Sequence, residues 1–154
     1  MHLTEFLDFD AIKPALPAGN KRSLLGQLAN LAAARLELPA APILETLTER
    51  EKLGSTGFGQ GVAIPHGKVE GLKQIYGMFV RLAEPIGFKA IDRKPVDLVF
   101  LLLSPPDAGP EHLKALAAVS RVVRNAPTLE KMRGARSRDA LAAVLLGADE
   151  RDAA

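Results

Sequence analysis

The stretch from Gly54 to Lys68 is the part of this chain best suited to chemistry. It reads GSTGFGQGVAIPHGK and surrounds a short apolar run with glycines, ending in Pro65 and one histidine, His66. Glycine lets the main chain approach a ligand closely or adopt positive φ, and proline ends strand pairing because it has no N–H. We therefore expect a strand over 62–64 that delivers one imidazole to a sheet edge, where it can react with a partner outside the fold. A glycine-rich turn carrying a surface imidazole is the alternative interpretation.

An arginine, Arg50, occupies an unusual position just before this stretch. It lies seven residues after Ile43 and three after Leu47, so the helical period places it on the apolar face of a helix expected over 42–53. A charge on that face needs a partner. The guanidinium either pairs with a nearby acid, extends to solvent from the helix end, or points into the glycine-rich site, where its planar fork suits a phosphate.

A second histidine, His112, falls in the first turn of a helix expected to begin at Pro110. The exposed N–H groups and positive dipole end of a helix N-terminus disfavour a charged imidazole and attract anions. A neutral His112 could hydrogen-bond a group carried on His66 or orient its ring. A solvated surface histidine is the alternative.

The order GSTGxGxGxAIPHG resembles the phosphorylation-site signature of type-2 enzyme IIA domains of the bacterial phosphoenolpyruvate-dependent phosphotransferase system, most closely the nitrogen-regulatory branch. The resemblance runs from the first turn to about Leu146, nearly the whole chain. In that family the histidine of the IPHG segment carries the phosphoryl group, which implies this role for His66. The resemblance also implies that Arg50, in its ERE segment, contacts the phosphoryl group. The histidine of the EHL segment, His112, would be the second histidine of the site.

The resemblance implies a phosphoryl relay that requires no cofactor and no metal. A neutral His66 nitrogen would take the group from the phosphohistidine of an HPr-like phosphocarrier protein, NPr in the nitrogen branch. Arg50 would neutralise charge on the moving group. The hydroxyls of Ser55 and Thr56, with glycine N–H groups such as that of Gly67, would donate hydrogen bonds to it.

Three other functions stay open at this stage. Sugar-specific enzyme IIA components of the fructose or mannitol type share the same site. The residues of the motif resemble the regulatory branch more closely, and in that branch the phosphorylation state controls partners such as potassium transporters or sensor kinases. A pure interaction module is a rival of another class. A hydrolase with His66 as general base is a weaker one, because the sequence shows no convincing serine or cysteine nucleophile.

Helices and strands must carry these residues to one place. Asn20 is a plausible helix N-cap, and Pro39 a helix stop. Periodicity predicts an edge strand near 11–13, helices over 21–37 and 42–53, strands over 74–83 and 96–103, a turn and short strand over 85–88, a helix over 110–123, and closing helices over 128–134 and 138–146. The most continuously apolar segment, 96–103, should be the central strand. Residues 147–154 are polar, and we expect them to fray.

These elements predict an α/β fold, a mixed sheet with helices on both faces, of the enzyme IIA mannitol and nitrogen type. We expect one domain over 1–154, with its core at about 3–146. The site should form at one end of the sheet, from the end of the strand before His66, the end of the helix with Arg50 and the start of the helix with His112.

Composition restricts the remaining possibilities. The chain has 154 residues, 47% of them hydrophobic, 25% charged and 5% aromatic, with a net charge of +2. The charges are scattered, so no nucleic-acid footprint is expected. There is no cysteine, which excludes disulfides and thiolate metal sites. The longest apolar run is far below the roughly 20 residues of a membrane span, and no signal peptide is indicated, so we expect a cytoplasmic protein without membrane insertion.

Overall fold

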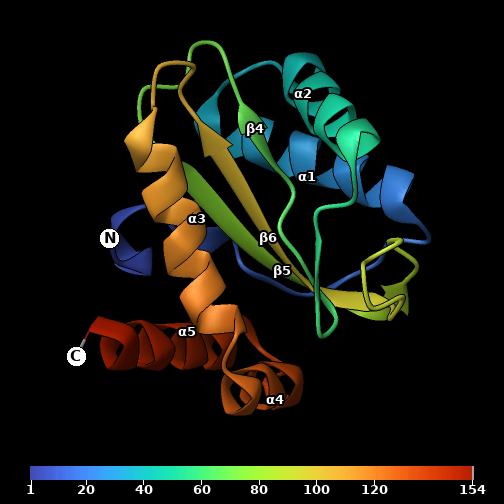
Figure 1. The fold of residues 1–154 in the computed structure, drawn as a ribbon, viewed down its shortest axis with the longest axis vertical. Coiled ribbons are helices and arrows are strands. Elements are labelled where there is room, and N and C mark those ends of the chain that lie inside the picture. Colours follow the sequence, from blue (N-terminus) through green and yellow to red (C-terminus); the bar gives the residue numbers. More distant parts are fainter. Residues whose placement is uncertain (154) are drawn as a thin grey trace.

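A six-stranded mixed sheet with helices on both faces forms the structure, a computed structural model that describes residues 1–153 (Figure 1). The predicted α/β fold class is confirmed. In chain order the elements are η1 (Leu3–Glu5), η2 (Phe9–Ala11), β1 (Lys13–Leu16), α1 (Lys21–Leu36), α2 (Ala40–Leu53), β2 (Gly57–Gly59), β3 (Val62–Ala63), β4 (His66–Lys68), β5 (Tyr76–Ile86), β6 (Val96–Ser104), α3 (Pro110–Val123), α4 (Ala126–Gly134) and α5 (Arg138–Ala153).

Strand β6 is the centre of the sheet, as its continuous apolar sequence predicted. The strand order is β1-β5-β6-β3-β2, and β4 also pairs with β6. On one side β5 runs antiparallel to β6, and on the other β3 and then β4 run parallel to it. The predicted edge strand is present as β1, two residues later than expected, because Ala11 belongs to the η2 turn.

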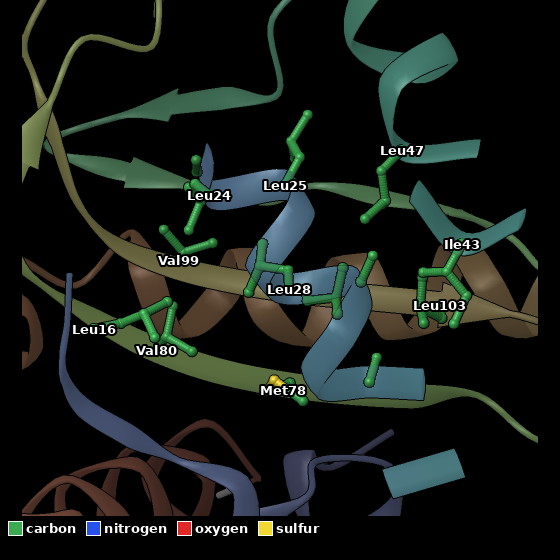
Figure 2. Close-up of a cluster of buried hydrophobic side chains, with 14 of the residues drawn as sticks. Leu16, Leu24, Leu25, Leu28, Ile43, Leu47, Met78, Val80, Val99 and Leu103 are labelled. Carbon is green, nitrogen blue, oxygen red and sulfur yellow. The ribbon is translucent and has the colours of Figure 1, made fainter. Parts of the chain in front are cut away.

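Alternate residues of β6 face two separate cores, which is why both faces of this strand are apolar. Val99, Leu101 and Leu103 pack against α1 and α2, together with Met78 and Val80 of β5. Figure 2 labels all of these residues except Leu101. The other face of the sheet packs against α3, α4, α5 and η1, and its buried β6 residues are Leu98, Phe100 and Leu102.

Helices α1 and α2 cover the first face, and the hydrogen bonding of their first-turn N–H groups explains where each begins. Asn20 caps α1 as predicted, because its side chain accepts a hydrogen bond of 2.8 Å from the Ser23 N–H. Helix α2 begins at Ala40, two residues before the predicted start at Pro42. Proline is tolerated there because the first-turn N–H groups of a helix have no partner within the helix. Within residues 1–153, no helix is both long and apolar enough to cross a bilayer.

Two predicted boundaries, one in β5 and one at the start of α4, are wrong. The expected turn and short strand over 85–88 do not form, because β5 continues through Pro85 to Ile86, where its register with β6 shifts. A proline is compatible with a strand at such an irregularity. Helix α4 begins at Ala126, earlier than the predicted Thr128, because the Asn125 side chain accepts a hydrogen bond of 3.1 Å from the Thr128 N–H.

The C-terminal segment is helical where fraying was expected. Helix α5 continues to Ala153, and Ala148 and Asp149 are buried. These two residues continue the helical spacing of Leu141 and Leu145. The Asp149 carboxylate accepts a hydrogen bond of 2.7 Å from the Leu3 N–H, which ties the end of α5 to η1. Residue 154 lies outside the described residues.

Replacing Asp149 by alanine tests this tie. The Leu3 N–H would lose its buried acceptor, so we expect Asp149→Ala to lower the free energy of unfolding by about 1–3 kcal/mol. Urea denaturation measures the change. The matched control is Glu150→Ala, which removes the same charge from the exposed neighbouring position and should change the value by less than about 0.5 kcal/mol. Equal effects of the two variants would contradict a structural role for the Asp149 contact.

Candidate functional site

A break in a strand beside β6 presents His66. β3 and β4 pair with β6 in succession, and pairing pauses between them at Ile64 and Pro65. It resumes with His66 opposite Leu102, whose N–H donates to the Pro65 carbonyl at 3.0 Å. The expectation that the histidine follows the end of strand pairing is therefore wrong, since His66 is the first residue of the second paired segment. This pairing fixes the main chain that carries the imidazole.

One hydrogen bond determines which nitrogen of His66 is free. Its Nδ1 lies 2.7 Å from the main-chain oxygen of Ile64. A carbonyl oxygen can only accept, so Nδ1 must carry the proton. In the neutral ring, Nε2 then has the free lone pair and is the nucleophilic nitrogen.

The surroundings of this ring favour its uncharged form. Burial lowers the pKa of His66 below its usual value, and the positive charge of Arg50 lowers it as well. The hydrogen bond to Ile64 and the negative charge of Glu51 act in the opposite direction without reversing the shift. A lowered pKa leaves the lone pair available at neutral pH.

Arg50 reaches the same place from the end of α2. It lines a small hollow of about 260 Å³ beside His66. One of its terminal N–H groups donates to the Gly54 carbonyl at 2.8 Å. A guanidinium has five N–H donors, so others can serve an anion in the hollow. The other residues that line the hollow are Ser55, Thr56, Gly57, Phe58, Ile64, Leu116 and Ser120.

His112 lies in the first turn of α3, as predicted, and its ring is close to that of His66. The two ring centroids are 5.5 Å apart and the planes are inclined by 48°. Burial lowers the pKa of His112, and the charges of His66 and Lys68 lower it further. The structure thus places the His112 ring beside that of His66, which shares its hollow with Arg50, although His112 does not itself line that hollow. No group of three or more His, Asp or Glu side chains in residues 1–153 is arranged to hold a metal ion.

Both hydroxyl groups predicted as phosphate donors have other acceptors in this structure. Ser55 donates to the Phe88 carbonyl at 2.8 Å and accepts from the Gly57 N–H at 3.0 Å. The Thr56 hydroxyl donates to the Glu51 carboxylate. A hydroxyl has a single proton to donate, so these groups shape the loop around the hollow.

Glu51 is a site residue that the sequence analysis missed. Its carboxylate accepts from the Thr56 N–H at 3.0 Å and from the Lys21 ammonium at 2.8 Å, so it connects the 54–57 loop to the start of α1. A signal was present, because Glu51 lies four residues after Leu47 and therefore faces inward by the same helical period that singled out Arg50.

Two glycines act through their lack of a side chain. A Cβ on Gly67 would lie 2.9 Å from the Thr46 hydroxyl oxygen, so the absence of a side chain lets β4 approach α2. Gly67 does not line the hollow.

Gln60 and Gly61, with φ of 58° and 78°, form the two-residue turn between β2 and β3. Positive φ at both positions suits such a hairpin turn. Arg133 holds this turn by donating to the Gln60 carbonyl at 2.6 Å.

Comparison with other proteins gives consistent results. Residues 5–147 match the family model described as phosphoenolpyruvate-dependent sugar phosphotransferase system, EIIA 2. A nitrogen regulatory protein of Bradyrhizobium diazoefficiens is 46% identical, over 94% of this chain and 95% of the relative. A nitrogen regulatory protein of Escherichia coli K12 is 37% identical, over 94% and 90%. The crystal structure of nitrogen regulatory protein IIA-Ntr from Neisseria meningitidis is 40% identical, with a TM-score of 0.87, over 93% of this chain and 98% of that one.

The protonation of the two site histidines gives a direct test of the electrostatics. We expect NMR titration midpoints of His66 and His112 below the usual value of about 6.5. The same resonances in the urea-unfolded chain provide the reference. Because folding lowers both pKa values, their contribution to stability is complete above the unfolded pKa and is lost as pH falls through the folded pKa.

Two variants that remove charges of opposite sign serve as controls for each other. Arg50→Gln removes a positive charge and should raise the titration midpoint of His66, whereas Glu51→Gln removes a negative charge and should lower it. Shifts of the same sign in both variants, or folded midpoints no lower than the unfolded ones, would contradict the electrostatic description.

Proposed function

Because this chain belongs to the EIIA 2 family of the phosphoenolpyruvate-dependent sugar phosphotransferase system, we propose that His66 is its phosphoryl acceptor. The observation that carries the proposal is the state of this ring. Its Nδ1 proton is held by the Ile64 carbonyl, which leaves the Nε2 lone pair free; the ring shares a hollow with Arg50, and its centroid is 5.5 Å from that of His112. A phosphohistidine phosphocarrier is the partner expected for an EIIA domain.

Transfer to His66 requires no net proton movement. The Nε2 lone pair attacks the phosphorus of the carrier's phosphohistidine, and the electron pair of the breaking P–N bond returns to the carrier's imidazole. Nδ1 of His66 keeps its proton. The Ile64 carbonyl oxygen at 2.7 Å stabilises the positive charge that the ring gains when Nε2 gives up its lone pair.

The neighbouring residues position and neutralise the transferred group. Arg50 provides a positive charge and N–H donors to the phosphoryl oxygens. His112 provides a second ring, whose centroid is 5.5 Å from that of the His66 ring. Ser55 and Thr56 act on the shape of the loop, because their hydroxyl protons are donated to the Phe88 carbonyl and the Glu51 carboxylate, which lie outside it. Gly67 contributes by letting β4 lie close to α2.

We place the protein in the regulatory branch of the family. Its relatives at 37–46% identity over nearly the whole chain are named nitrogen regulatory proteins. In this proposal the carrier is the HPr-like protein of the nitrogen branch, NPr, and the phosphorylation state of His66 controls target proteins such as potassium transporters or sensor kinases. The exchange takes place in the cytoplasm. The alternative is a sugar-type component that passes the group on to a sugar.

Phosphorylation by labelled phosphoenolpyruvate tests the acceptor. With enzyme I and the carrier present, we expect one acid-labile, alkali-stable label per chain, and none in His66→Ala. Arg50→Gln should accept the label more slowly, on the order of 100-fold, because a donor to the charged transition state is lost. His2→Ala is the matched control, since it removes an imidazole remote from the hollow, and it should label normally. Label retained by His66→Ala would reject the assignment.

The fate of the label distinguishes the two branches. The labelled protein, freed of carrier, is incubated with membranes that contain fructose- and mannitol-specific components and with each sugar. We expect no labelled sugar phosphate above the background without the protein, since a regulatory component keeps the group or returns it to the carrier. A fructose-specific enzyme IIA, labelled in the same way, is the positive control. Sugar phosphate formed at a comparable rate would support the sugar-type alternative.

A further inference from the structure

Ser104 interrupts a row of apolar side chains at the end of β6. The residues before it on the same face are Leu98, Phe100 and Leu102, all buried against the helices of the α3 side. Ser104 is also fully buried, with 0% of its surface exposed. A hydroxyl in such a place needs a hydrogen-bond partner, because water cannot reach it.

The partner is His112, whose Nδ1 is hydrogen-bonded to the Ser104 hydroxyl oxygen. Across residues 1–153 the structure gives this hydroxyl no other partner. If Nδ1 carried the proton and donated it, the serine proton would be left buried without an acceptor. If the serine donates to Nδ1, both groups are satisfied. The second arrangement requires the neutral His112 ring to carry its proton on Nε2.

Main-chain contacts hold Ser104 in place relative to His66. Its backbone pairs with Lys68 of β4, two residues after His66, and its carbonyl accepts from the Val69 N–H at 2.8 Å. The serine that binds the His112 ring is therefore attached to the same strand pair that presents the His66 ring. Because both rings are held by the same pair of strands, their positions relative to each other are fixed.

We propose that Ser104 is a positioning residue that locks His112 as the Nε2–H tautomer, so that this N–H donates a hydrogen bond to the phosphoryl group on His66. The proposal rests on the proposed function of His66 for its second half. Its first half, the tautomer, concerns the unmodified protein. The two rings then have complementary states, since His66 offers a lone pair at Nε2 and His112 offers a proton at Nε2.

The tautomer is measured by nitrogen-15 NMR of the unphosphorylated protein above the titration range of the imidazoles. In the unchanged protein we expect the His112 proton on Nε2 alone, and in Ser104→Ala a mixture in which Nδ1–H is detected. Ser104→Thr keeps the donor and should restore the single tautomer. A ring already protonated at Nδ1 in the unchanged protein, or an identical single tautomer in Ser104→Ala, would overturn the proposal. A merely structural role for Ser104 would leave the tautomer unchanged.

The consequence for phosphorylation is measured by the equilibrium distribution of label between the carrier and this protein. We expect Ser104→Ala to hold less label, by between about 3-fold and 10-fold, the range for a partly lost hydrogen bond to a charged group. Ser23→Ala, the same change at an exposed site on α1, should leave the distribution unaltered. If the unchanged protein and Ser23→Ala take no label, the proposed function fails and the NMR result alone decides the tautomer. If both take label and Ser104→Ala holds as much, the role of Ser104 in phosphorylation is rejected.

Discussion

The pairing of β4 with β6 is the constraint on which the site depends. It fixes the main chain of His66 opposite Leu102, and two residues further it fixes Lys68 opposite Ser104. The Ile64 carbonyl that binds Nδ1 of His66 lies in the break just before this pairing. β6 is buried between two cores, so its position cannot shift without disturbing both. The buried central strand thus fixes the main chain that carries the His66 ring.

Two charges of opposite sign at the end of α2 act differently on the hollow beside His66. Arg50 and Glu51 are consecutive residues at the end of α2, but their effects on the pKa of His66 are opposite. The Glu51 charge is balanced by Lys21 and bound to the 54–57 loop, whereas Arg50 lines the hollow. In the proposed function, a phosphoryl group on His66 would meet the Arg50 guanidinium in the hollow, while the Glu51 carboxylate stays paired with Lys21 and the loop.

Prediction failed where a tertiary contact overrode a local signal. Pro85 was interpreted as the start of a turn, but pairing of β5 with β6 resumes at Ile86 beyond it. Gly147 and the charges after it suggested fraying, but the buried contact between Asp149 and Leu3 keeps α5 helical. The roles of Ser55 and Thr56 as phosphate donors stay predictions from their position in a motif, and only the folded structure shows that other acceptors take both hydroxyl protons here.

The sequence by itself determined the family, the central strand and the two-sided packing, and it predicted that Arg50, His66 and His112 belong to one site. Apolar periodicity and a dense glycine motif are local properties, and they can be read along the chain. Tertiary structure decided which nitrogen of His66 is free, how the loop hydroxyls are used, and which groups Glu51 and Ser104 contact. These depend on hydrogen bonds between residues brought together by folding, and a hydrogen bond requires a distance and a direction that spacing in the sequence does not specify.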